Sequence, residues 1–134
     1  MAVPREAPDP PTALLLGGDG TVPGAVLAHA VEAAGFEVVG MVGHWVEAVE
    51  RVADLTVDVA VVDLALTGSV GVRLISVLRA AAPSCAVIAL SPLEEIDLVV
   101  LEAGADEVVQ PTDLRPLTAA LERIAARRAH ARRP

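Results

Sequence analysis

The most constraining feature of this 134-residue chain is a short apolar run, Asp58 to Asp63, with an aspartate at each end. The run is rich in β-branched valine and shows no polar alternation, which is typical of a strand buried on both faces in a parallel sheet. Asp63 then stands at the carboxyl end of that strand, where open α/β sheets bind their ligands. Asp63 is therefore the first candidate functional residue, and a loop that holds Thr67 and Gly68 is expected to follow it.

Apolar runs of strand length alternate along the chain with segments of helical periodicity. The predicted strands are residues 13–17, 36–42, 58–63, 85–90 and 107–109. The predicted helices are residues 22–34, 44–55, 71–82 and 96–103, and a last one that Asp113 caps and whose apolar stripe is Leu114, Leu117, Leu121 and Ile124. Five strands that alternate with five helices predict a single α/β domain with a parallel sheet covered on both faces.

The helical spacing also predicts which side chains face the core. In the first helix Val22, Val26, Ala30 and Ala33 share a face, and in helix 44–55 Trp45, Val49 and Val52 do so. The third helix has its stripe at Gly71, Leu74, Ile75, Leu78 and Ala82. Leu98 and Leu101 lie off the core stripe of helix 96–103 beside acidic residues, which suggests a contact with a partner or a second copy.

Composition bounds the domain organisation and the cellular location. With 54% hydrophobic residues the chain can bury a core, but no apolar run approaches the roughly 20 residues that cross a bilayer. The first residues lack the basic-then-apolar order of a signal peptide. We therefore expect a cytoplasmic protein without membrane contact: residues 1–12 a disordered leader, 13–126 the folded domain, and 127–134 an arginine-rich tail or the start of a linker. The single Cys85 is interpreted as a small buried core residue.

Charge is distributed unevenly along the chain. All 18 acidic residues lie at or before Glu122, whereas five of the ten arginines lie from Arg123 onward. The acidic body should repel nucleic acid. The terminal arginines could contact phosphate or an acidic partner, but arginines near a helix C-terminus also complement its dipole, and we favour that interpretation. The chain contains no lysine.

The predicted sheet brings Asp19, Asp63, Ser91 and Gln110 to one edge, because each follows or ends a parallel strand. Two neighbouring carboxylates repel each other, and Mg²⁺ commonly relieves that repulsion. A carboxylate beside Mg²⁺ can attack a phosphoryl group if cationic and hydroxyl groups neutralise the phosphoryl oxygens. Simpler interpretations remain: Asp63 could cap the turn that follows it, and Asp19 and Ser91 could be ordinary turn residues.

Several segments together resemble the receiver domain of bacterial two-component response regulators, from about Ala13 to Ile124. The segment DLALTGSVG, Asp63 to Gly71, looks like the phosphoacceptor aspartate, its loop and the glycine that opens the third helix. The segments AAGFEVVG, VIALS and LEAGADEVV stand where the family has its second strand, its fourth strand and the approach to its fifth. The resemblance implies a (βα)5 flavodoxin-like, doubly wound parallel sheet with strand order 2-1-3-4-5.

The resemblance also implies roles for the residues at the sheet edge. Asp63 would accept the phosphoryl group, and Ser91 would hydrogen-bond its oxygens. Mg²⁺ would be bound by Asp19, Asp63 and the backbone carbonyl of Ala65. The sequence departs from the family pattern where Gly18 replaces an acidic ligand and Gln110 replaces the lysine. These departures predict weak Mg²⁺ binding and weak phosphorylation, since Gly18 removes a carboxylate ligand and Gln110 can donate hydrogen bonds but brings no positive charge.

Three functional hypotheses follow. The favoured one is a receiver-type signalling module with a degenerate phosphorylation site, which acts through partner or dimer contacts and is not an enzyme. The second is a functional receiver that uses Asp63 and Mg²⁺ and is phosphorylated by a histidine kinase. The third, a flavodoxin-like protein that binds a small ligand through its GGDG segment, is weak because that segment lacks both GxGxxG and a P-loop lysine.

The expected partners are a histidine kinase or another signalling protein. A second copy of the chain could bind through helix 96–103, strand 107–109 and the last helix. Nucleic acid would be bound only by an output domain outside this chain.

Overall fold

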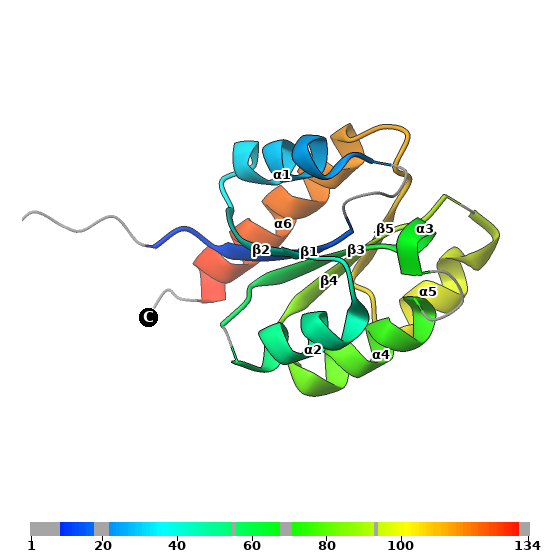
Figure 1. Ribbon diagram of the computed structural model, residues 1–134. Helices are drawn as coiled ribbons and strands as arrows, with labels where there is room; N and C mark the ends of the chain where they lie inside the picture. The colour runs from blue at the N-terminus through cyan, green and yellow to red at the C-terminus, as the bar shows by residue number, and fades with distance from the viewer. Residues whose placement is uncertain (1–8, 18–21, 55, 68–70, 93, 132–134) are drawn as a thin grey trace, which may run out of the picture.

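The computed structural model describes residues 9–17, 22–54, 56–67, 71–92 and 94–131. Its strands are β1 (Thr12–Leu16), β2 (Glu37–Val42), β3 (Val59–Asp63), β4 (Ala86–Leu90) and β5 (Glu107–Val109). They pair in parallel in the order β2-β1-β3-β4-β5 (Figure 1). The predicted flavodoxin-like sheet and its strand order are therefore confirmed.

Helices cover both faces of this sheet. They are α1 (Gly24–Ala33), α2 (Trp45–Asp54), α3 (Leu64–Thr67), α4 (Gly71–Ala81), α5 (Asp97–Ala103) and α6 (Arg115–Ala131), with a 3-10 turn η2 (Glu94–Ile96) before α5. In Figure 1, α1 and α6 lie on one face and α2, α4 and α5 on the other. None of the helices in the described ranges is long and apolar enough to cross a membrane.

Strand β3 is the centre of the core, as its sequence predicts. All of its five residues are buried, and alternate side chains serve the two faces. Val59 and Val61 pack in the layer with α1 and α6, whereas Ala60 and Val62 pack in the layer with α2 and α4. A strand with apolar neighbours on both sides needs apolar side chains at every position, which explains the missing alternation.

The core faces of three helices match the predicted spacing to different degrees. The stripe of α4 is confirmed, since Gly71, Leu74, Ile75 and Leu78 are all buried. In α1 the prediction is wrong: Leu27 and Val31 are buried, whereas Val26 is 47% exposed. Val22 is buried but precedes α1, which starts only after Pro23, so a periodicity counted from Val22 has the wrong phase.

The prediction for α2 also needs correction at its first residue. Ala48 and Val52 are buried and Val49 is partly buried, but Trp45 is 42% exposed. Trp45 begins the helix, and its ring stacks on that of His44 instead of entering the core. His44 Nδ1 accepts the backbone N–H of Val46, which satisfies a donor that the first turn leaves unpaired.

Two segment boundaries differ from expectation. The segment after Asp63, predicted as a loop, begins with the helix α3, because Leu and Ala favour helix and Asp63 caps its start. At the other end, α6 continues through Ala131, so the domain end expected at residue 126 falls within a helix. Gly68, residues 1–8 of the expected leader and residues 132–134 lie outside the described residues.

Candidate functional site

The strand register brings three predicted site residues to the carboxyl edge of the sheet. Asp63 is level with Leu90 in the β3–β4 pair, and Leu90 is level with Val109 in the β4–β5 pair. Ser91 and Gln110 are the next residues after those two, so they and Asp63 end three adjacent strands. The backbone N–H of Ser91 donates to the carbonyl of Val109 across 2.9 Å, which fixes the height of Ser91 at this edge.

Asp63 is completely buried, and one of its carboxylate oxygens accepts a backbone hydrogen bond. Its Oδ1 accepts the backbone N–H of Ala65 across 2.9 Å. This bond caps α3, as the simpler interpretation of Asp63 predicts. It also orients the carboxylate and brings the backbone at Ala65 next to it. A capping role and a role in phosphoryl chemistry are therefore compatible at this position.

The other predicted acidic ligand belongs to a segment that the structure does not describe. Leu16 pairs with Val62, and the buried Gly17 that follows donates its N–H to the carbonyl of Val42. Gly18 and Asp19 lie outside the described residues. Within the described ranges, no three His, Cys, Asp or Glu residues gather closely enough to hold a metal ion. Of the two carboxylates predicted at this edge, that of Asp63 belongs to the described residues.

Arg115, the first arginine after β5, is ion-paired with the neighbouring Asp113. Arg115, the first residue of α6, forms an ion pair and hydrogen bonds with Asp113 at 2.8–3.1 Å. Asp113 Oδ1 also accepts the backbone N–H of Arg115, so the predicted cap is present. The Arg115 hydrogen bonds lower the pKa of Asp113 to about 2. Because the Arg115 side chain is 91% exposed and bound to Asp113, it does not take the place of a lysine at the buried edge.

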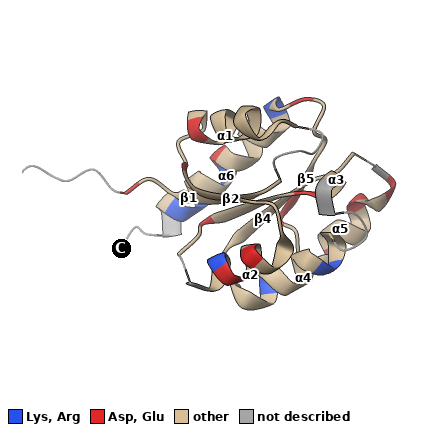
Figure 2. Cartoon of the chain, viewed as in Figure 1, with Lys and Arg blue, Asp and Glu red and all other residues tan. Residues whose placement is uncertain are grey.

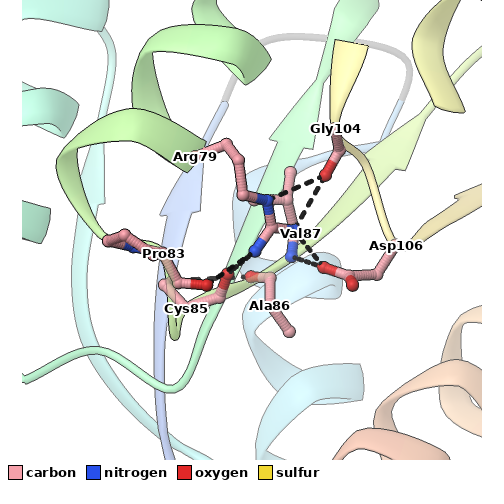
Figure 3. A network of polar contacts seen from close by, with 7 residues as sticks. All are labelled: Arg79, Pro83, Cys85, Ala86, Val87, Gly104 and Asp106. Atoms are coloured by element: carbon pink, nitrogen blue, oxygen red, sulfur yellow. Dashed lines mark hydrogen bonds and ion pairs between the residues drawn. The ribbon is translucent and has the colours of Figure 1, made fainter. Parts of the chain in front are cut away.

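A polar network that the sequence did not reveal lies at the opposite, amino-terminal edge (Figure 3). Arg79 on α4 donates to the carbonyls of Pro83, Cys85 and Gly104 and pairs with Asp106. Asp106 also accepts the backbone N–H of Val87 at 2.7 Å. One guanidinium thus joins α4, the start of β4 and the turn between α5 and β5.

Cys85 is buried beside this network, as predicted, although β4 begins one residue later. Burial raises the pKa of its thiol from 9.0 to about 11, and the nearby Arg79 only partly opposes that rise. The thiol is therefore protonated at neutral pH, which fits a core residue and not a nucleophile.

A second ion pair corrects the interpretation of the terminal arginines. Arg128 on α6 pairs with Asp58 at 2.5 Å, and the Asp58 side chain is only 5% exposed. Asp58 also accepts the backbone N–H of Thr12 at 2.7 Å. Arg128 therefore binds the last helix to the amino-terminal edge of the sheet and is not merely solvated. The acidic residue Asp58 at the start of a buried strand could have indicated an ion pair from the sequence, but its partner Arg128 is 70 residues away.

Apolar side chains are exposed on α5, as predicted for Leu98 and Leu101. Leu98 is 73% exposed and Leu101 is 42% exposed. The helical spacing of residues 96–103 puts both Val99 and Val100 on the core stripe; Val100 is buried, whereas Val99 is 51% exposed. Acidic residues colour the helix and the turn before it red in Figure 2, and Glu95 and Glu102 are both exposed.

The chain is similar to known proteins over most of its length. The model of the response regulator receiver domain family matches residues 19–122, which include Asp63, Ser91 and Gln110. A protein-glutamate methylesterase/protein-glutamine glutaminase 5 of Myxococcus xanthus (strain DK1622) is 37% identical over 121 residues, 85% of this chain and 33% of that protein. The chain thus spans about a third of the length of this relative.

Three solved structures share the fold. A response regulator of Thermotoga maritima has a TM-score of 0.74 at 22% identity, covering 87% of this chain and 98% of that one. A LuxR family DNA-binding response regulator of Silicibacter pomeroyi has a TM-score of 0.71 at 28% identity, covering 87% and 92%. The receiver domain of a sensor histidine kinase of Pseudomonas aeruginosa PAO1, with magnesium in its active site cleft, has a TM-score of 0.72 at 22% identity, covering 88% and 99%.

Proposed function

This chain belongs to the response regulator receiver domain family, and we propose that it is a member with a degenerate phosphorylation site. In this proposal Asp63 keeps the phosphoacceptor position, but the charge that makes such a site reactive is reduced. The chain then signals by presenting a surface to a partner protein, and it has no enzymatic activity of its own. A receiver that is fully phosphorylated by a histidine kinase is the alternative that the experiments below can establish.

The observation that carries this proposal is the neutral side chain of Gln110 at the end of β5, on the edge where Asp63 lies. Asp63 and Ser91 are completely buried at the carboxyl edge, and Gln110 ends the next strand where a lysine is expected. Charge-assisted hydrogen bonds are about twice as strong as neutral ones, so Gln110 stabilises a phosphoryl oxygen less than a lysine would. No lysine exists elsewhere in the chain to compensate, and Arg115 is bound by Asp113.

The donor set at this edge fits a weak Mg²⁺ site. Asp63 supplies one carboxylate, and the backbone at Ala65 lies beside it through the hydrogen bond to Oδ1. Mg²⁺ is commonly held by one or two carboxylates together with water and phosphate oxygens. Asp63, the carbonyl of Ala65 and Asp19 would hold the ion, which would neutralise charge on a phosphoryl group. Gly18 would provide no ligand, so we expect low affinity.

The surface proposed to contact a partner is formed by α5, β5 and α6. These correspond to helix 96–103, strand 107–109 and the last helix of the sequence prediction. Leu98 and Leu101 are exposed on α5, and singly exposed leucines are common, but two on one helix with Val99 form an apolar group. We propose that this group binds a signalling protein or a second copy of the chain in the cytoplasm.

Chemical phosphorylation of the purified chain tests the proposal. With acetyl phosphate and millimolar Mg²⁺, we expect intact-protein mass spectrometry to detect little or no added phosphoryl group. The Asp63→Asn variant gives the background, and an established receiver domain treated in parallel shows that the reagent is active. Stoichiometric labelling that Asp63→Asn abolishes would refute the degenerate site and establish the functional receiver instead.

A further inference from the structure

A charged groove lies at the amino-terminal edge of the sheet, on the opposite side from Asp63. It has a volume of about 360 Å³, near the lower end of small-molecule sites. Its lining residues are Asp58, Arg79, Pro83, Ser84, Ala86, Asp106, Ile124, Arg127 and Arg128. Asp58, Ala86 and Asp106 stand at the starts of three adjacent strands, which places the groove at that edge. A second hollow of about 470 Å³ shares Asp106 and Arg127 with it.

The charges around this groove are mostly fixed in pairs. Arg79 is bound to Asp106, Arg128 to Asp58, and Arg123 in the adjoining hollow to Glu107. Arg127 lines both hollows and has no carboxylate partner among the described residues. Two matched pairs and one remaining guanidinium give the groove a single excess positive charge, and the matched pair in the adjoining hollow adds none. Because Arg79 and Arg128 are held by their partners, the wall is in place before any ligand arrives.

Two further features favour a ligand that carries an acceptor oxygen. The carbonyls of Pro83, Cys85 and Gly104, which would repel an anion, accept hydrogen bonds from Arg79. In addition, Nε of Arg128 is buried and has no hydrogen-bond acceptor among the described residues, and Oδ1 of Asp58, which is ion-paired with Arg128, is likewise buried without a hydrogen bond. A buried donor without an acceptor is unfavourable, so a ligand oxygen that reaches Nε would relieve that cost while Asp58 stays in its ion pair.

The remaining lining of the groove is apolar. Ala86, Ile124 and Pro83 contribute hydrocarbon surface next to the charged groups. A single positive charge beside an apolar wall matches a ligand with one negative charge on a hydrophobic body. We propose that this groove binds a small organic carboxylate, with Arg127 as the group that pairs with its charge. This site is separate from the phosphorylation edge and does not depend on the state of Asp63.

The test is a titration of the full ¹⁵N-labelled chain at low salt, monitored by NMR. The probes are benzoate, its neutral isostere benzamide, and acetate, which carries the charge without the apolar body. We expect benzoate to cause saturable shifts at the amides of Ala86, Ile124 and Arg127, with no such shifts from benzamide and weaker ones from acetate. Absence of saturable shifts with benzoate, or equal binding of benzamide, overturns the proposal without any variant.

The variants Arg127→Gln and Arg73→Gln separate this site from general attraction to arginine. Arg73 is an exposed arginine on α4 that does not line the groove, so its loss should leave benzoate binding unchanged. Loss of one charge-assisted contact in Arg127→Gln should weaken benzoate binding by about fivefold. Equal effects of the two substitutions, or no effect of Arg127→Gln, would contradict the assignment.

Discussion

Arg79 and Asp106 form an ion pair of 2.5 Å between α4 and the residue that precedes β5, and each side chain also binds backbone groups. The guanidinium donates to Gly104, which ends α5 with a positive φ of 123° and lies in contact with Arg79. The carboxylate accepts from Val87 in β4. The pair therefore positions the end of α5, and with it the surface proposed to bind a partner, relative to the sheet.

Replacement of Arg79 by alanine should destabilise the chain more than is usual for a residue whose side chain is partly exposed. It removes the ion pair and leaves the carbonyls of Cys85 and Gly104 without their donor, which we expect to lower the free energy of unfolding by about 2–3 kcal/mol. Urea denaturation measures this change. Arg73→Ala, at an exposed position of the same helix, should change it by about 0.5 kcal/mol or less. Similar values for both variants would show that the network contributes little.

The stability of the chain should fall between pH 9 and pH 11 because of Cys85. In the unfolded chain the thiol ionises near its ordinary pKa of 9.0, whereas burial keeps it protonated in the fold up to about 11. The stability is therefore fully present below pH 9 and decreases by about 2–3 kcal/mol as the pH rises through 11. The chain has no lysine and no tyrosine, so no other side chain titrates across this range.

Urea denaturation at several pH values checks this decrease, with Cys85→Ala as the control. The alanine variant should lose some stability at every pH but should not show the decline above pH 9. The thiol of the native chain should also react slowly with a disulfide reagent at pH 8 and rapidly in denaturant. A decline of the same size in Cys85→Ala would assign it to another cause.

The fold could be predicted from the sequence because buried strands and α4 carry patterns that depend on local residues alone. β3 is apolar at every position, and α4 repeats its apolar residues at exact helical spacing. The predicted core faces of α1 and α2 are wrong where a residue outside the apolar pattern determines which side chains are buried. Pro23 sets the start of α1 and hence its phase, and the ring of His44 gives Trp45 a partner outside the core.

The candidate site shows the same division. Asp63, Ser91 and Gln110 could be placed at one edge because parallel strands align their carboxyl ends. The pairs Arg79–Asp106 and Arg128–Asp58 could not, since 27 and 70 positions separate the partners and isolated charged residues carry no periodic signal. The simpler interpretation of Asp63, a cap for the turn after it, is seen in the bond from the N–H of Ala65, but the helical form of that segment depends on Leu64–Thr67 as well.

The apolar group on α5 should mediate self-association if a second copy is its partner. Light scattering over a concentration series should then show the average mass rising toward that of a dimer. Leu98→Glu and Leu101→Glu should prevent the rise, because a carboxylate on this surface would lose its hydration in the interface. Val26→Glu introduces the same charge at an exposed apolar position of α1 and should have no effect. A monomer at all concentrations would leave a different signalling protein as the partner.

Restoring the missing cation should increase phosphorylation of Asp63 if its loss makes the site degenerate. In Gln110→Lys the ammonium group would follow β5 at the level where Ser91 follows β4, close enough to the edge to neutralise a phosphoryl oxygen. We expect acetyl phosphate and Mg²⁺ to label this variant about tenfold more than the parent chain, since a charged donor replaces a neutral one.

The matched controls are Arg115→Lys, which changes a neighbouring exposed cation without adding charge, and Gln110→Lys combined with Asp63→Asn. The first should behave like the parent chain, and the second should not be labelled. Equal labelling of Gln110→Lys and the parent would mean that the lysine position does not limit the reaction. The missing acidic ligand at Gly18 would then be the determinant to restore, and Gly18→Asp would test it by the same assay.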